Sequence, residues 1–302
     1  MNTICDILLP DPFLSGNALN GGIPFQITIF GAMPIEKSRN ILQEGMELRS
    51  RYLERNVQVD LYLPDGMADM REVSLLLIND GQDLGKMGLA GILSELYQSG
   101  RLSPLLCVGI HAGEGRKMEY GTAVGVDYQG WGARAGAYTR FIFEELIPAI
   151  RSRYEAPDFR EKAFAGFSLG ALSALDIVWH HPQEFTRAGL FSGSFWWRKV
   201  DKDDPGYTET RDRIMHEEVR NGSFCPWLKF FFECGTEDEQ EDRNHNGIID
   251  SIDDTLDLIG ELAAKGYDLQ RDVRYLEIAG GRHEVATWGR AMPEFLLWGW
   301  GK

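Results

Sequence analysis

Residues 163–170 read Ala-Phe-Ala-Gly-Phe-Ser-Leu-Gly (AFAGFSLG), and the rest of the chain is best understood from this stretch. An apolar run that enters Gly-x-Ser-x-Gly and continues as an apolar helical pattern is typical of a nucleophile elbow. The glycines at 166 and 170 would let the strand and the helix approach closely, and Ser168 would project above the sheet with strained backbone angles. We therefore predict that Ser168 is a nucleophile; a Gly/Ser turn without chemistry is the alternative.

Further short apolar runs surround this elbow. They suit strands buried on both faces of a sheet and lie at residues 74–78, 105–110, 163–167, 188–191, 229–234 and 273–278. Helical patterns lie between or after them, at residues 143–154 (where Pro148 should kink the helix), 169–181, 255–265 and 284–300. Alternating strands and helices predict an α/β fold, in which helices cover both faces of a mainly parallel sheet.

Residues 43–63 follow a different pattern, with apolar and polar side chains in alternation. This alternation predicts an antiparallel hairpin that adds strands at one edge of the sheet. No repeat, low-complexity tract or linker is visible, so residues 1–302 are predicted to form a single domain. The polar stretch 194–227 has aromatic residues at both ends and is predicted to be an insertion or cap near the site.

The charge balance bears on the partners of the protein. Lys and Arg number 31 and Asp and Glu number 46, which gives a net charge of −15. An acidic surface repels nucleic acid and anionic membranes, so we expect a small-molecule substrate and neither of those partners. Residues 1–16 show no secretory signal, and the predicted location is cytoplasmic. The scattered cysteines are expected to be reduced thiols: Cys5, Cys107, Cys225 and Cys234.

A serine nucleophile needs a base and an acid that orients the base, here in the chain order Ser, acid, His. His283 follows the last predicted strand through Gly-Gly-Arg and is the predicted base; a loop histidine that caps the final helix is the alternative. The acid is expected on the loop after residues 229–234. Asp238, three residues beyond Gly235, is the predicted acid, and Glu237 is the alternative.

Two backbone N–H groups are needed to stabilise the oxyanion that forms when the serine attacks. Leu169, directly after the nucleophile, is predicted to supply one. The second is expected from Gln82, in the Asn-Asp-Gly-Gln loop that follows the strand 74–78; a plain turn is the alternative.

Trp196 and Trp197 follow the strand next to the elbow and are predicted to flank the mouth of the pocket. Paired tryptophans there would stack on an aromatic or sugar group of a substrate. The alternative is that one or both close the core. Arg116 and Glu119 also lie at this edge, where we expect an internal ion pair to tie the loop together rather than substrate binding.

Residues 242–253 match the calcium loop of an EF-hand, with oxygen ligands at alternate positions and Gly247 at the sharp turn. A strand rather than a helix leads into the loop, so it stands alone. The predicted ligands are Asp242, Asn244, Asn246, the Ile248 carbonyl, Asp250 and Asp253. A structural Ca²⁺ here would rigidify the loop that carries the triad acid; an Asn/Asp-rich turn without an ion is the alternative. No organic cofactor is expected.

These motifs together resemble the "putative esterase" family of α/β hydrolases, which includes enterochelin esterases, feruloyl esterase domains and mycolyltransferases. The resemblance covers nearly the whole chain. It rests on residues 57–64, 76–82, 116–120, 141–150, GFSLG at 166–170, FSGSFWW at 191–197 and GGRHEVATW at 280–288. The segment 191–197 is most similar to enterochelin esterases. The resemblance implies an α/β-hydrolase fold.

The predicted triad and the resemblance together imply a serine esterase. In this interpretation Ser168 attacks an ester carbonyl, His283 takes its proton, Asp238 orients the imidazole and water releases the acyl group. An acyltransferase on the same triad is one alternative. A catalytically silent calcium-binding or ligand-binding module is the other, and the intact triad disfavours it.

Overall fold

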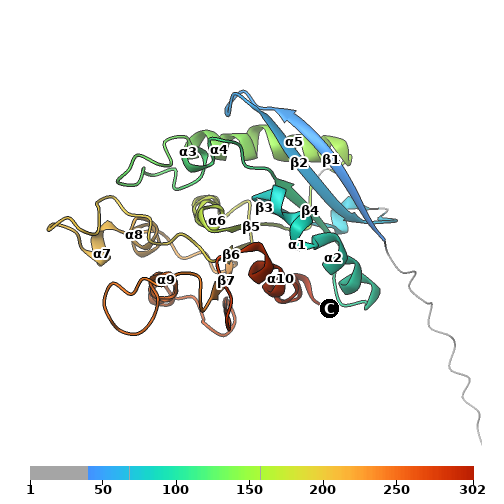
Figure 1. Ribbon diagram of the computed structural model, residues 1–302. Helices are drawn as coiled ribbons and strands as arrows, with labels where there is room; N and C mark the ends of the chain where they lie inside the picture. Colours follow the sequence, from blue (N-terminus) through green and yellow to red (C-terminus); the bar gives the residue numbers. More distant parts are fainter. Residues whose placement is uncertain (1–39, 68, 157) are drawn as a thin grey trace, which may run out of the picture. The chain divides into compact units, whose positions relative to one another are not determined.

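The computed structural model describes residues 40–302 except 68 and 157, and the described residues lie in one compact unit. Its sheet has the strand order β1-β2-β4-β3-β5-β6-β7-β8 (Figure 1). The α/β prediction is therefore confirmed. The predictions of a single domain over 1–302, of no secretory signal and of a reduced Cys5 extend to residues 1–39, which lie outside the described residues.

The strands and helices alternate along the chain from β3 onward. The strands are β1 (Ile41–Arg49), β2 (Asn56–Pro64), β3 (Ser74–Asn79), β4 (Leu105–Ile110), β5 (Lys162–Phe167), β6 (Arg187–Phe191), β7 (Lys229–Gly235) and β8 (Val273–Ile278). The α-helices are α1 (Leu84–Met87), α2 (Leu89–Gln98), α3 (Arg116–Glu119), α4 (Ala135–Phe141), α5 (Ile147–Arg153), α6 (Leu169–His180), α7 (Glu209–Asp212), α8 (Ile214–Asn221), α9 (Asp250–Lys265) and α10 (Val285–Trp300). Short turns of other helix types are η1 (Met70–Glu72), η2 (Gly81–Asp83) and η3 (Ile142–Leu146).

The hairpin of β1 and β2 forms the antiparallel edge that the alternating pattern predicts. β1 pairs antiparallel with β2, and β2 pairs antiparallel with β4. All other neighbouring strands are parallel. The six predicted runs match β3 to β8. β3 to β7 are buried along almost their whole length, and side chains of a strand that is buried on both faces are apolar in both directions. The expectation of burial on both faces is wrong for β8, which ends the sheet and exposes Arg274 and Glu277.

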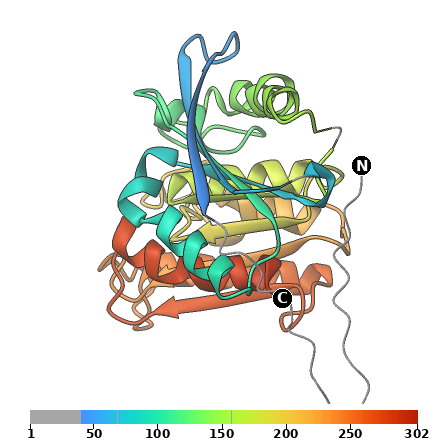
Figure 2. The same cartoon turned by 90° about the vertical axis from the view of Figure 1, so that its right-hand side faces the viewer.

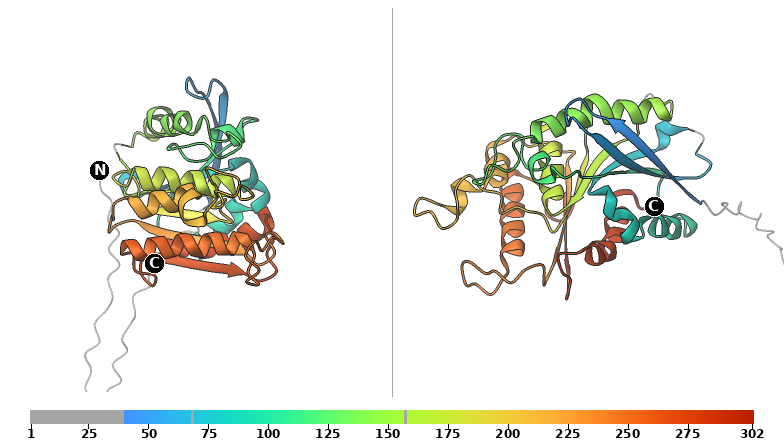
Figure 3. Two further views of the ribbon diagram at one scale, coloured as in Figure 1. Left: turned by 90° about the vertical axis from the view of Figure 1, so that its left-hand side faces the viewer. Right: turned by 45° about the horizontal axis from the view of Figure 1, so that its top comes forward.

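Each face of the sheet is covered by its own group of helices. On one face α1, α2 and α10 pack against strand residues such as Leu76, Ala165 and Phe231. On the other face α4, α5, α6, α8 and α9 pack against residues such as Phe164 and Phe230. Figures 2 and 3 show these two layers of helices from other sides.

The parallel strands bring distant parts of the chain to one edge of the sheet. Ser168 directly follows β5, Asp238 follows β7 and His283 follows β8, so all three lie beyond carboxyl ends of parallel strands. The segments with α3 and α7, and the loop before α9, extend at this end, on the left in Figure 1. This edge is where open parallel sheets bind their ligands.

Two helices differ in detail from the predicted ranges. Where a kink was expected near Pro148, the π-helical turn η3 joins α4 to α5. Proline has no N–H for the carbonyl four residues earlier and clashes with it, and a wider turn relieves both problems. α9 begins at Asp250, earlier than the predicted residue 255, because its first turn is formed by the acidic loop itself.

The described residues also bear on the cysteines and on membrane-spanning helices. Cys107, Cys225 and Cys234 are free thiols, and Cys107 and Cys234 are buried, as predicted. No helix within residues 40–302 combines the length and the apolar character that crossing a membrane requires.

Candidate active site

Ser168 occupies the strained elbow that its sequence predicts. Its backbone angles are φ 56° and ψ −124°, a sparsely populated conformation for a residue with a side chain. A Cβ on Gly166 would lie 2.3 Å from the carbonyl oxygen of Gly170, so the two motif glycines are in direct contact. The Ser168 N–H donates to the Phe191 carbonyl at 2.9 Å and fixes the turn to the end of β6.

The Ser168 hydroxyl has a neighbour that the motif does not reveal. Its Oγ lies 3.5 Å from Oγ of Ser194, and the Ser194 N–H donates to the Ser168 carbonyl at 3.2 Å. Within the described residues Ser168 and His283 form no hydrogen bond; such contacts in substrate-free sites often tighten only when substrate binds. The sequence signal for Ser194 is its place in the FSGSFWW segment after β6.

The two predicted oxyanion amides lie at the start of α6 and in η2. Neither the Leu169 nor the Gln82 N–H donates to a backbone carbonyl of the described residues. The Gln82 side chain is fixed by accepting the Ala112 N–H at 3.0 Å. Both amides are therefore available as donors, which is the property an oxyanion hole needs.

An ion pair between buried Asp80 and half-buried Arg116 supports this loop. Asp80 is left-handed (φ 60°), and each of its carboxylate oxygens accepts a 2.7 Å hydrogen bond from the Arg116 guanidinium. Arg116 also donates to the carbonyl of Phe167, next to the nucleophile. The Asp80 carboxylate fills the space where a Cβ on Gly170 would lie, at 2.6 Å. The second motif glycine therefore makes room for Asp80, in the loop of the predicted oxyanion donor Gln82, as well as for the helix.

The predicted internal ion pair of Arg116 and Glu119 is wrong, because each residue pairs with a partner on another element. Arg116 pairs with Asp80, and Glu119 pairs with Arg55 at 2.8 Å. These pairs join α3 to the oxyanion loop and to the turn between β1 and β2.

His283 lies in the loop between β8 and α10. Its ring meets the Trp288 ring edge-on, with centroids 5.5 Å apart. The residue is exposed, yet the surrounding protein atoms reduce the hydration of its ring and lower its pKa. The Asp238 carboxylate acts on the pKa in the opposite direction, and the Arg116 guanidinium lowers it further. His283 is therefore within electrostatic reach of both the predicted acid and the elbow.

Asp238 is partly buried and directed inward. Its Oδ2 accepts the Gly235 N–H at 3.1 Å, while its buried Oδ1 has no hydrogen-bond partner in the described residues. Burial raises the pKa of this carboxyl, and His283 opposes the shift. The alternative acid, Glu237, instead points outward and pairs with Arg282 at 3.2 Å.

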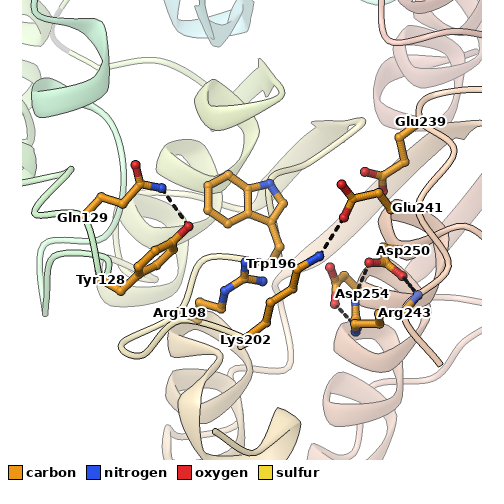
Figure 4. A pocket seen from close by; sticks show the side chains of 10 residues that line it. All are labelled: Tyr128, Gln129, Trp196, Arg198, Lys202, Glu239, Glu241, Arg243, Asp250 and Asp254. Atoms are coloured by element: carbon orange, nitrogen blue, oxygen red, sulfur yellow. Dashed lines mark hydrogen bonds and ion pairs between the residues drawn. The ribbon is translucent and has the colours of Figure 1, made fainter. Parts of the chain in front are cut away.

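A cavity of about 210 Å³ lies beside the loop that carries Asp238. Figure 4 shows Trp196 between Tyr128 and Gln129 on one side of the cavity and charged side chains on the other. The lining residues are Tyr128, Gln129, Trp196, Arg198, Lys202, Glu239, Glu241, Arg243, Asp250 and Asp254. The guanidinium of Arg198 lies within 6 Å of the ring centres of Tyr128 and Trp196.

The two neighbouring tryptophans have different surroundings. Trp196 is half-buried and lines the cavity, whereas Trp197 is fully buried in the core. A Cβ on Gly121 or Gly132 would lie within 3 Å of the Trp197 ring, so that ring fills the space beside two glycines. Trp196 is thus the member of the pair that faces the cavity.

Comparison with known proteins agrees with this architecture. The model of the "Putative esterase" family matches residues 50–298. The chain belongs to this esterase family.

This esterase-family chain is similar to two curated relatives and to one solved structure. Iron(III) enterobactin esterase from Dickeya dadantii is 28% identical over 204 residues, which cover 63% of this chain and 42% of that protein. Endo-1,4-beta-xylanase/feruloyl esterase from Xylanibacter ruminicola is 24% identical over 212 residues, covering 70% and 23%. The enterobactin esterase of Shigella flexneri, solved with enterobactin, has a TM-score of 0.64 at 20% identity and covers 85% and 58%. The chain thus spans less than two thirds of each of these three proteins.

The acidic loop of this esterase-family chain folds around two carboxylates. Asp242 accepts the backbone N–H groups of Asn246 and Gly247, at 3.1 and 2.9 Å. Asp253 Oδ2 accepts the side-chain amides of Asn244 and Asn246, both at 2.8 Å. Gly247 is left-handed (φ 88°), as the motif requires.

One predicted calcium ligand points elsewhere in this structure. The buried Asp250 carboxylate accepts the Arg243 N–H at 2.8 Å and lies 3.4 Å from its guanidinium. Over the described residues no group of three or more His, Cys, Asp and Glu side chains is placed to hold a metal ion. The side chains that converge in the loop combine two carboxylates with amides: Asp242, Asn244, Asn246 and Asp253.

Proposed function

We propose that this protein is a serine esterase that hydrolyses a small carboxylic ester with Ser168 as the nucleophile. The observation that carries the proposal is the strained backbone of Ser168 at a strand-to-helix turn whose two glycines are in contact. The esterase family and the enterobactin and feruloyl esterases among the relatives support an ester as the substrate. The negative charge of Asp238 raises the pKa of His283, which supports Asp238 as the acid and His283 as the base.

The mechanism follows from the placement of these groups. The imidazole of His283 takes the proton of the Ser168 hydroxyl as its oxygen attacks the ester carbonyl, and it returns the proton to the leaving alcohol. Asp238 orients the ring and stabilises the imidazolium. The N–H groups of Leu169 and Gln82 stabilise the oxyanion, and a water molecule, activated by His283, then releases the acid.

A fluorophosphonate probe tests the activated serine. We expect one covalent adduct per chain by intact mass spectrometry, because the probe reacts with a serine that has a functioning base. The adduct should be absent in Ser168→Ala and unchanged in the control Ser94→Ala, whose serine lies on α2. An adduct that persists in folded Ser168→Ala would contradict the proposal.

The cavity at Trp196 is proposed to bind one part of the ester. An aromatic face beside charged and amide groups suits a ring that carries polar substituents. Trp197 would contribute indirectly, by fixing the backbone next to Trp196 from within the core.

Replacing Trp196 by alanine is expected to raise KM about 10-fold while kcat changes little, because stacking holds the ground state and the transition state alike. Steady-state kinetics with aryl and alkyl esters measure both constants. Trp227→Ala is the matched control, since that exposed tryptophan lies outside the cavity. A fall in kcat at constant KM would show that Trp196 acts in another way.

A structural calcium ion in the loop 242–253 is a further part of the proposal. The converging side chains described above fit an oxygen ligand set, with Asp250 able to take part if it turns from Arg243. Bound calcium would offset the repulsion between Asp242 and Asp253 and stiffen the loop that begins with Asp238.

Removing calcium with a chelator is expected to lower the Tm by roughly 5 to 10 °C, since a ligand present at 100 times its Kd stabilises by about 2.7 kcal/mol. The double variant Asp242→Asn, Asp253→Asn should melt at the lower temperature whether or not calcium is present. Asp65→Asn, outside the loop, should behave like the wild type. Equal Tm values with calcium and with chelator would refute a structural ion.

A further inference from the structure

Glu233 is a carboxyl group enclosed by the protein beside the proposed active site. It lies in β7, is 0% exposed, and neither Oε atom has a hydrogen-bond partner of normal geometry in the described residues. An ionised carboxylate in such a place is strongly disfavoured. Burial, and then the charge of Asp238, raise the pKa of Glu233 to about 8. At neutral pH this side chain therefore carries a proton that it can donate.

The Asp238 carboxyl lies on the same face of β7 as Glu233. Side chains two residues apart in a strand share a face, so position 235 projects to the same side as position 233. Gly235 has no side chain, and a Cβ there would lie 2.5 Å from Asp238 Oδ1. The Asp238 carboxyl thus fills the side-chain position next to Glu233 along the strand.

The contacts of Asp238 and Ser192 explain why the proton lies on Glu233 rather than on Asp238. Asp238 accepts the Gly235 N–H, and the charge of His283 acts on its carboxyl group; both favour the ionised form of Asp238. The hydroxyl of Ser192, which accepts the Trp288 indole N–H at 2.9 Å, lowers the pKa of both carboxyls and so lies near both.

Other titratable groups near Glu233 act more weakly on it. Arg290, on α10, lowers its pKa less than burial and Asp238 raise it. Cys234 points to the opposite face of β7, where its thiol contacts Thr255 of α9 and burial raises its pKa and keeps it neutral. From β8, the residue paired with Glu233 is the apolar Leu276. The neighbouring Glu233 and Asp238 thus have three buried oxygens without partners and one proton to share.

We propose that Glu233 is a positioning residue: as a neutral acid it donates a hydrogen bond to Asp238 Oδ1 and holds that carboxylate toward His283. This inference rests on the proposed triad. Glu233 touches neither substrate nor the reacting atoms, and it acts through Asp238. Ionisation of Glu233 would remove the donor and place a second negative charge beside Asp238.

Two replacements of Glu233 separate this role from simple packing. Glu233→Gln keeps an N–H donor and cannot ionise, so kcat should stay within about 3-fold of the wild type at pH 7. Glu233→Met keeps the volume without a donor, and kcat should fall 10- to 100-fold with KM nearly unchanged, the usual effect of losing a hydrogen bond to a charged group. In the wild type kcat/KM should fall above pH about 8 as Glu233 ionises, and Glu233→Gln should lack this fall.

A measurement without substrate completes the test. Carboxyl-carbon NMR should show Glu233 protonated and Asp238 ionised at pH 7. Ionised Glu233 at pH 7, or equal kcat losses in Glu233→Gln and Glu233→Met, would overturn the positioning role. A normal kcat in Glu233→Met would also overturn it. Failure of the proposed esterase activity is a distinct result, because wild-type protein would then form no Ser168 adduct.

Discussion

His283→Ala is expected to lower kcat for an ester substrate by on the order of 10⁵- to 10⁶-fold, because without a base the Ser168 hydroxyl is a weak nucleophile at neutral pH. The residual rate would come from the oxyanion donors and substrate binding alone. Initial rates with an activated aryl ester, measured on protein with unchanged circular dichroism, give the effect directly.

His181→Ala is the control for this loss. His181 follows α6 at the end opposite Ser168 and packs against Phe143, so its removal should leave kcat within a few-fold of the wild type. The lowered pKa of His283 adds a second check: the base is active when neutral, so the acidic limb of kcat/KM should lie below pH 6.5. More than a tenth of the wild-type rate in His283→Ala would exclude His283 as the base.

Gly166→Ala is expected to destabilise the protein by about 3 kcal/mol or more and to abolish the Ser168 adduct. The new methyl group would lie 2.3 Å from the Gly170 carbonyl oxygen and 2.4 Å from its carbon, both backbone atoms that cannot turn aside. Relief requires α6 to move away from β5, which displaces the elbow between them. Urea unfolding and probe labelling measure the two effects.

Gly91→Ala is the matched control for this substitution. Gly91 lies in α2, and a Cβ there would meet no atom within 4 Å. Alanine is the better helix former, so the free energy of unfolding should rise by about 0.5 to 1 kcal/mol. If Gly166→Ala were as stable as Gly91→Ala and still labelled, the close contact in the elbow would be wrong.

Local sequence patterns predicted the strands and the elbow because each is determined by residues that are close in the chain. The apolar runs at β3 to β8 and the two glycines around Ser168 need no information from elsewhere. The π-helical turn η3 and the early start of α9 were not predicted, since both depend on how a helix end meets its neighbours.

Parts of the candidate site depend on contacts between distant residues. Trp196 and Trp197 are adjacent in sequence, and only the position of Gly121 and Gly132 determines which ring enters the core. Glu233 stands in an apolar run, where its relation to Asp238 depends on strand alternation and on the turn after Gly235. Ser192 takes a positive φ of 44° two residues before Ser194, whose hydroxyl lies 3.5 Å from that of Ser168.

The position of β8 makes the candidate site sensitive to local unfolding at the edge of the sheet. Among residues 40–302, β8 is the outermost strand at its end of the sheet and pairs only with β7, while His283 lies in the loop that follows it. Edge elements open at lower free energy than central ones, so brief detachment of β8 would remove the base while β3, β5 and β6 stay in place. Turnover would then cease under mild denaturant before the bulk secondary structure is lost, and amides of β8 would exchange with deuterium ahead of those in β5. Catalytic activity in this chain would therefore report on the cohesion of a single outer strand rather than on the folded state as a whole.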